Sequence, residues 1–150
     1  SPECAPVHSK AAGLYMICTL SKHAAEADGF DDALMLDWRG QIAETTGANV
    51  FLVIDGVIHT PTPDCFLNGI TRRSVMDLAR SQGIEIVERA IMPEELPKAA
   101  EIFVTGTAAE VTPVSQIDNM KFGVGPITKM LLADYDQLGR EPLRADTSVS

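Results

Sequence analysis

Lys10 stands in the segment SKAAGLY (9–15), where a serine precedes it, three small residues follow it and Tyr15 lies five positions further on. An amine becomes a nucleophile toward carbonyl groups when it is neutral, and burial or a neighbouring cation lowers its pKa. Small flanking residues would let a flat ligand lie close to the backbone beside this amine. The alternative is a surface lysine whose stem lies along the protein while its charge stays in water.

Glu44 lies in the segment ETTGANVF (44–51), among small and neutral residues between two apolar runs. A carboxylate in such surroundings is costly unless it meets a cation or a hydrogen-bond donor. Glu44 is therefore a candidate partner for a positively charged group. A solvent-facing glutamate at the edge of a hairpin is the alternative interpretation.

Two further segments offer backbone N–H groups to a ligand. In LNGITRR (67–73) a glycine and Thr71 open an expected helix, whose positive end attracts anions; alternatively, Thr71 is only its N-cap. In TGTAAEVTP (105–113) the small residues after Thr107 leave N–H groups accessible at a strand end, or they form a tight turn. The segment VGPITK (124–129) has the look of the first and shows how often this pattern occurs by chance.

Hydrophobic periodicity predicts the scaffold that must position these residues, a mixed α/β domain with much antiparallel pairing rather than strict βαβ alternation. The segments WRG (38–40) and DG (55–56) are typical of hairpin turns, and Gly83 is expected to end a helix. Helices are expected over 9–28, 71–82, 92–100 and 125–141. Strands are expected over 33–37, 41–45, 49–56, 57–60, 84–91 and 101–107, with an extended segment over 111–118.

Composition restricts the partners of this 150-residue chain. A net charge of −9 argues against nucleic acid, which requires a concentrated basic face. No apolar run approaches the ~20 residues that a membrane span needs. The three cysteines are widely spaced, which indicates free thiols in a reducing compartment rather than a disulfide framework. The three histidines are equally scattered, so the spacing does not indicate a metal site. We therefore expect a soluble, cytoplasmic protein, and the charge does not exclude a small anionic ligand.

Together the four segments resemble the class IV, pyridoxal-phosphate-dependent aminotransferases, most closely the branched-chain amino acid aminotransferases. SKAAGLY resembles the catalytic-lysine segment of that family, and Lys10 precedes Glu44 by the family's spacing of 34 residues. GTAAEVTP resembles its second phosphate and carboxylate loop. The family pattern between residues 44 and 72 is matched at Glu44, Asn49, Val50, Phe51, Ile58, Thr60, Leu67, Gly69, Ile70 and Arg72.

The resemblance implies a role for each candidate toward pyridoxal 5'-phosphate. Lys10 would hold the cofactor as a Schiff base and move the proton between the substrate Cα and the cofactor. Glu44 would pair with the protonated pyridine nitrogen, Tyr15 would hydrogen-bond the phenolic oxygen, and Leu67 would pack on the ring. The phosphate would be bound at the helix start by Gly69, Ile70 and Thr71 together with Thr107, and the substrate carboxylate by the backbone of Thr107 and Ala108.

The resemblance also implies a fold and a reaction. Residues 1–140 would form the large pseudo-barrel domain of a D-amino acid aminotransferase-like enzyme, and 141–150 a flexible tail. A small N-terminal domain would be missing, since only nine residues precede Lys10 and the chain begins with Ser1. The intact protein, a homodimer or larger, would transfer the amino group of leucine, isoleucine or valine to 2-oxoglutarate. A D-amino acid aminotransferase, an aminodeoxychorismate lyase and a non-catalytic binding or assembly module are the alternatives.

Overall fold

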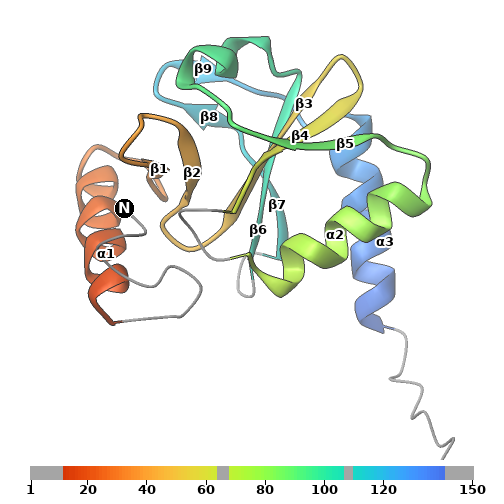
Figure 1. The fold of residues 1–150 in the computed structure, drawn as a ribbon, viewed down its shortest axis with the longest axis horizontal. Coiled ribbons are helices and arrows are strands. Elements are labelled where there is room, and N and C mark those ends of the chain that lie inside the picture. Colours follow the sequence, from red (N-terminus) through yellow and green to blue (C-terminus); the bar gives the residue numbers. More distant parts are fainter. Residues whose placement is uncertain (1–11, 64–67, 107–109, 141–150) are drawn as a thin grey trace, which may run out of the picture.

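The computed structural model describes the backbone of residues 12–63, 68–106 and 110–140, with side chains from residue 20 to residue 138 within these ranges. Its centre is a five-stranded sheet in the order β5-β4-β3-β6-β7 (Figure 1). These strands are β3 (Asn49–Ile54), β4 (Val57–Pro61), β5 (Ile86–Arg89), β6 (Glu101–Gly106) and β7 (Glu110–Pro113). The mixed α/β fold predicted from periodicity is confirmed.

Helices and two small hairpins surround this sheet. Helices α2 and α3 pack against each other and against β6, whereas α1 lies beside the β1–β2 hairpin at the other end of the molecule (Figure 1). The remaining elements are α1 (Ala12–Ala27), β1 (Leu34–Leu36), β2 (Ile42–Thr45), α2 (Ile70–Ser81), the 3-10 helix η1 (Pro93–Lys98), β8 (Gln116–Ile117), β9 (Met120–Lys121) and α3 (Pro126–Arg140). Within the described ranges no helix is long and apolar enough to cross a membrane.

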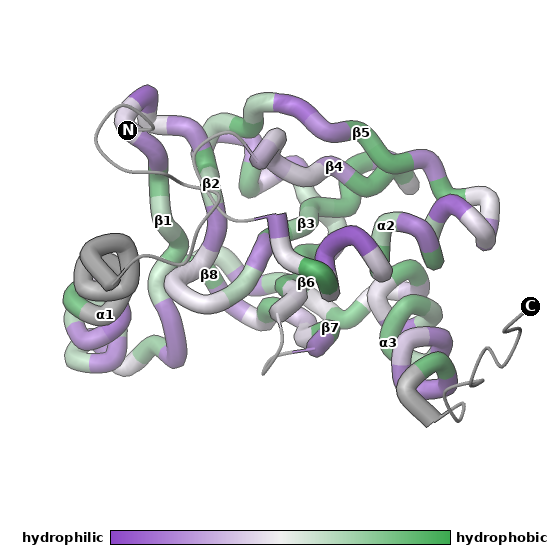
Figure 2. The backbone as a smooth tube through the Cα atoms, turned by 60° about the horizontal axis from the view of Figure 1, so that its bottom comes forward, coloured by the Kyte–Doolittle hydropathy of each residue, from purple (hydrophilic) through white to green (hydrophobic). Residues whose placement is uncertain are grey.

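Strand β3 is apolar on both faces because a hydrophobic core covers each side of the sheet. Phe51 faces α2 and stacks on Phe103 of β6, its register partner, with ring centroids 4.9 Å apart. Leu52 points the other way, toward the core shared with β2 and η1. Figure 2 shows the hydrophobic stretches of β3 and β4 and the alternating hydropathy along α2, whose apolar residues meet the sheet. Burying each such side chain contributes roughly 1.5–3 kcal/mol.

The crossover β4–α2–β5 adds one parallel pair to the largely antiparallel pattern that was predicted. Strand β5 runs parallel to β4, with Ile58 opposite Ile86, while every other strand pair in the described chain is antiparallel. Helix α2 makes this possible, because parallel neighbours need a long connection, usually a helix. Gly83 ends α2 in the left-handed region at φ +76°, as its position predicts.

Both predicted hairpin turns are confirmed. Asp55 and Gly56 adopt positive φ angles of 52° and 77°, the conformation that tight two-residue turns require, and they join β3 to β4. At the other turn, the Asp37 carboxylate accepts the N–H groups of Arg39 and Gln41 and so fixes the chain between β1 and β2.

Several predicted boundaries need correction. The strand expected over 84–91 forms only at 86–89, and the segment 111–118 divides into β7 and β8. The helix expected over 92–100 is the shorter 3-10 helix η1, where the Glu95 carboxylate accepts the N–H of Met92 just before the first turn. A second proline inside this segment, Pro97, removes a backbone donor, so a longer regular helix is disfavoured.

The start of α3 receives a carboxylate from within the protein. Glu101, only 4% exposed, accepts the backbone N–H of Thr128 through Oε1 at 2.8 Å. A negative charge at a helix N-terminus is favourable because it meets unpaired N–H groups and the positive end of the dipole. The segment VGPITK thus has the pattern of an anion site because its helix start binds the carboxylate of Glu101 from the same chain.

Gly125→Ala tests this arrangement. An added Cβ would lie 2.6 Å from Oε1 of Glu101, so the buried carboxylate would have to leave the N–H of Thr128. We expect the free energy of unfolding to fall by about 1–3 kcal/mol, as for overpacking combined with a lost charged hydrogen bond. Chemical denaturation measures it. Gly123→Ala is the matched control, since nothing in the described part of the chain lies within 4 Å of its added Cβ; equal stability of the two variants would contradict the assignment.

Candidate functional site

Glu44 occupies the third position of β2, opposite Met35 of β1, and its side chain is half-buried. Burial raises the pKa of Glu44 to about 7, and the negative charge of Asp32 adds to the shift. Among the described side chains, none forms an ion pair with Glu44. Such a carboxyl group gains most from a ligand that brings a positive charge or a donor. It does not fit the interpretation of a freely solvated edge glutamate.

The turn after Glu44 is fixed by its own side chains. The Thr45 hydroxyl bonds with the backbone of Ala48, and the Thr46 hydroxyl donates to the carboxylate of Asp32. A close backbone approach then joins this turn to the end of β6, because a Cβ on Gly106 would lie only 2.9 Å from the carbonyl oxygen of Gly47. The turn that carries Glu44 therefore lies against the segment leading into 107–109.

Helix α2 begins at the same edge of the sheet. Gly69 is its N-cap, with extended φ −64° and ψ 151°, and no side chain among the described residues caps the helix. Thr71 is thus the second helical residue, and the interpretation of Thr71 as a simple N-cap is wrong. The N–H of Gly69 donates to Oδ1 of Asn49 at 3.3 Å, and a Cβ on Gly69 would lie 2.9 Å from that oxygen. A side chain at this position would push the Asn49 amide away, so the motif glycine permits this close contact.

The charges at the start of α2 are the reverse of those that normally stabilise a helix N-terminus. Its first turn carries no acidic residue, whereas Arg72 and Arg73 follow Thr71 directly. Basic residues are unfavourable near the positive end of the helix dipole. An anion bound at the N–H groups of Ile70 and Thr71 would offset that cost, and the side chain of Ile70 is 75% exposed beside them.

Strand β6 brings a third group to this edge. Thr105 is fully buried and is the register partner of Asn49, and its hydroxyl has no hydrogen-bond partner among the described residues. A buried polar atom of this kind calls for an additional partner. The structure thus assembles the Glu44 turn, the start of α2 and the end of β6 around Asn49.

The predicted site residues divide into two groups. The structure places Glu44 on β2, and it places Gly69, Ile70 and Thr71 at the start of α2. Lys10, Leu67, Thr107 and Ala108 lie outside the described residues, and Tyr15 belongs to α1 without a described side chain. The roles predicted for all nine therefore stay predictions.

Four contributors to this edge received no role from the sequence. Asn49 and Arg72 belong to the matched family pattern, and that match was the available signal for them. Thr105 lay in the segment singled out for its small residues. The position of Asp32 in the sequence gave no signal; its carboxylate accepts the Thr46 hydroxyl from the turn after Glu44.

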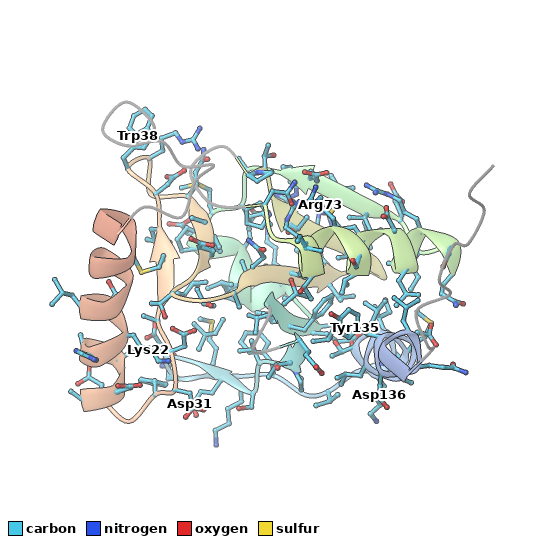
Figure 3. The ribbon with its side chains drawn as sticks, turned by 90° about the horizontal axis from the view of Figure 1, so that it is seen from below. Lys22, Asp31, Trp38, Arg73, Tyr135 and Asp136 are labelled. Atoms are coloured by element: carbon cyan, nitrogen blue, oxygen red, sulfur yellow. The ribbon has the colours of Figure 1, made fainter. Side chains whose placement is uncertain are left out.

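A separate recess of about 180 Å³ lies between the β1–β2 hairpin and the end of β4. Trp38 stands exposed at the hairpin turn near it, with the Arg39 guanidinium 5.5 Å from the ring centroid (Figure 3). Its described lining includes none of the predicted site residues and is formed by Asp37, Arg39, Gln41, Ile42, Ala43, Pro61, Thr62 and Ala90.

Comparison with known proteins identifies the family. The model of the class IV amino-transferases matches residues 2–117. The chain belongs to the class IV aminotransferase family. Over 133 residues, 87% of this chain and 43% of the relative, it is 43% identical to the branched-chain-amino-acid aminotransferase of Pseudomonas aeruginosa.

Solved structures agree with this assignment to the class IV family. The branched-chain aminotransferase of Thermoproteus uzoniensis with norvaline superposes with a TM-score of 0.90 at 40% identity, over 94% of this chain and 48% of that one. A second branched-chain amino acid aminotransferase, from T.th. and solved with pyridoxamine 5'-phosphate, gives 0.89 at 41% identity, over 94% and 49%. The predicted fold family is therefore confirmed. The chain spans about half the length of the relatives it matches.

The pH dependence of stability tests the environment of Glu44. Because its pKa is raised from 4.5 to about 7, the folded protein binds more protons than the unfolded chain between these values. Stability without added cofactor should therefore fall as the pH rises through this window, by up to about 3 kcal/mol for this group. Glu44→Gln should remove that part of the slope.

Denaturant unfolding of both forms at pH 5 and pH 8 measures the effect. Other titrating groups, such as His59, whose burial lowers its pKa, cancel in the comparison of the two proteins. Identical pH slopes for the two would contradict a buried Glu44.

Proposed function

We propose that the intact protein is a pyridoxal-phosphate-dependent transaminase that moves the amino group of leucine, isoleucine or valine to 2-oxoglutarate. The observation that carries the proposal is the half-buried carboxyl group of Glu44 at the same edge of the sheet as the start of α2. Among the described residues, Glu44 has no cationic partner and the first turn of α2 has no acidic residue. One ligand with a protonated ring nitrogen and a phosphate meets both needs. The names of the relatives, and the pyridoxamine phosphate of one of them, support this choice.

The residues of the chain would divide the work. Glu44 would keep the ring nitrogen protonated, and bound pyridoxal phosphate would then supply an electron sink for the carbanion formed at the substrate Cα. Lys10 would attach the cofactor and carry the proton to and from Cα. Tyr15 would donate to the phenolic oxygen, and Leu67 would cover one ring face.

Anion binding would fall to the backbone. The N–H groups of Ile70 and Thr71, with the Thr71 hydroxyl and Thr107, would hold the phosphate at the positive end of α2. The backbone of Thr107 and Ala108 would bind the substrate carboxylate.

The organisation of the protein is part of the same proposal. Residues 1–140 would be the large, cofactor-binding domain and 141–150 a tail, with a small N-terminal domain supplied by the same protein or by a separate chain. The shorter length of the chain relative to its relatives supports this. We further infer a homodimer or larger assembly in the cytoplasm, where three scattered cysteines stay reduced.

Steady-state rates on three substrates test the reaction. We expect the full-length protein to transaminate L-leucine with 2-oxoglutarate much faster than it processes D-alanine or aminodeoxychorismate. Preference for D-alanine or for aminodeoxychorismate would assign the protein to another branch of its family. Cofactor binding without turnover of any of these would favour a non-catalytic module.

Lys10→Ala should abolish covalent attachment of the cofactor. Borohydride reduction of the loaded wild-type protein, followed by peptide mapping, should place the label on Lys10. Lys22→Ala is the control, because Lys22 is exposed on α1 (Figure 3). A label on Lys22, Lys98, Lys121 or Lys129 would refute the role of Lys10.

Thr71→Ala should weaken cofactor binding by about 1.5–3 kcal/mol, the usual contribution of a hydrogen bond to a charged group. Alanine preserves the helix, since its helix propensity exceeds that of threonine. Titration of the apoprotein with cofactor, followed by absorbance, measures the dissociation constant. Ser74→Ala is the control, because Ser74 lies on the same helix directly after Arg73. An equal loss of cofactor affinity in Ser74→Ala would show that Thr71 has no particular part in binding.

A further inference from the structure

The side chain of Arg72 is the most deeply buried cation in the described part of the chain, with 1% of it exposed. Nη1 donates to Oδ1 of Asn68 at 3.0 Å, and Nη2 donates to the carbonyl oxygen of Pro61 at 3.0 Å and to Glu88 at 3.2 Å. The guanidinium therefore joins the end of β4, the residue before the helix cap, and the edge strand β5. Arginine suits this task because its planar fork fixes the directions of several donors at once.

These bonds act on the helix start rather than on the core. Asn68 and Gly69 form the turn that leads into α2, and Gly69 is held from the sheet side by Asn49. Arg72 holds the neighbouring Asn68 from the helix side. The backbone N–H groups of Ile70 and Thr71 directly follow this turn. The contacts of Gly69 with Asn49 and of Asn68 with Arg72 therefore set their direction.

The location of Arg72 is expensive for a purely structural link. Burial lowers its pKa, it stands near the positive end of α2, and its ionic partner Glu88 is 39% exposed and therefore screened by water. The start of α3, by contrast, receives a buried carboxylate, that of Glu101. A cation at the start of α2 instead increases the attraction of that end for an anion.

We propose that Arg72 is the positioning residue of the phosphate-binding start of α2: by holding Asn68 and Pro61 it aims the N–H groups of Ile70 and Thr71, without itself contacting the phosphate. This inference rests on the proposed function for the identity of the ligand. We call the hydrogen bonds from Arg72 to Asn68 and Pro61 the clamp. Loss of the clamp should weaken binding of the phosphate and leave binding of the rest of the cofactor unchanged.

Binding of pyridoxal phosphate and of pyridoxal, which lacks the phosphate, separates positioning from a general structural role. In the full-length apoprotein, Arg72→Lys keeps a positive charge but loses the fork. We expect its dissociation constant for pyridoxal phosphate to rise by about 10–100-fold, as when one hydrogen bond to a charged group is lost. Affinity for pyridoxal should change by less than about threefold, within the range of a lost neutral contact.

Two further variants keep the outcome clear. Asn68→Ala removes one hydrogen bond of the clamp and leaves Arg72 bound to Pro61 and Glu88. It should weaken binding of pyridoxal phosphate, but not of pyridoxal, by less than Arg72→Lys does. If Arg72→Lys does not fold, Asn68→Ala provides the test. Arg73→Lys is the matched control, because Arg73 is exposed beside Arg72 (Figure 3). Equal losses for pyridoxal phosphate and pyridoxal, or no loss in either clamp variant, would overturn the proposal.

Inorganic phosphate distinguishes failure of this inference from failure of the proposed function. In apoprotein labelled with 15N-isoleucine, added phosphate should shift the amide resonance of Ile70, and Arg72→Lys should weaken that response. A phosphate response of Ile70 that Arg72→Lys weakens, in a protein that binds neither pyridoxal phosphate nor pyridoxal, would reject the proposed cofactor and retain the positioning role. Unchanged phosphate binding in Arg72→Lys would reject the positioning role whatever the reaction is.

Discussion

The contact between Asn49 and Gly69 is the constraint on which the arrangement of the site depends. Asn49 belongs to β3, the strand buried on both faces, and its position is set by pairing with Thr105 of β6. Its side-chain oxygen lies so close to Gly69 that a larger residue at the cap of α2 would displace the Asn49 amide. A strand buried on both faces thereby positions a helix start and a strand end together, and regular elements hold functional groups more accurately than loops do.

The elements with strong local signals could be predicted from the sequence. The Asp55–Gly56 turn requires positive φ, and Gly83 ends a helix, so both followed from residue type alone. The parallel pairing of β5 with β4 could not, because Ile86 and Val87 suit either direction and the choice is made by α2 packing across the sheet. Pro97 shortened a predicted helix whose N-terminus was correct.

The candidate site was predictable in residue type more than in environment. The surroundings of Glu44 suggested a costly carboxylate, and the structure adds that Asp32 increases the cost from across a loop. The two helix starts with similar sequences, at Gly69 and Gly125, could not be told apart locally. What distinguishes them is Glu101, which lies 27 residues from Thr128 in the chain and reaches one start only through the fold.

The position of Glu88 has a consequence beyond its bond to Arg72. Among the described residues, β5 is an outer strand of the sheet that pairs with β4 alone, and a strand of another molecule can extend such an edge. A charged side chain on such a border opposes this kind of association, because adding a strand would bury the charge. The same carboxylate thus bonds to Arg72 and places a charge on the strand at the edge of the sheet, which disfavours pairing with another chain. Replacing it with an apolar residue would expose the protein to intermolecular β-pairing.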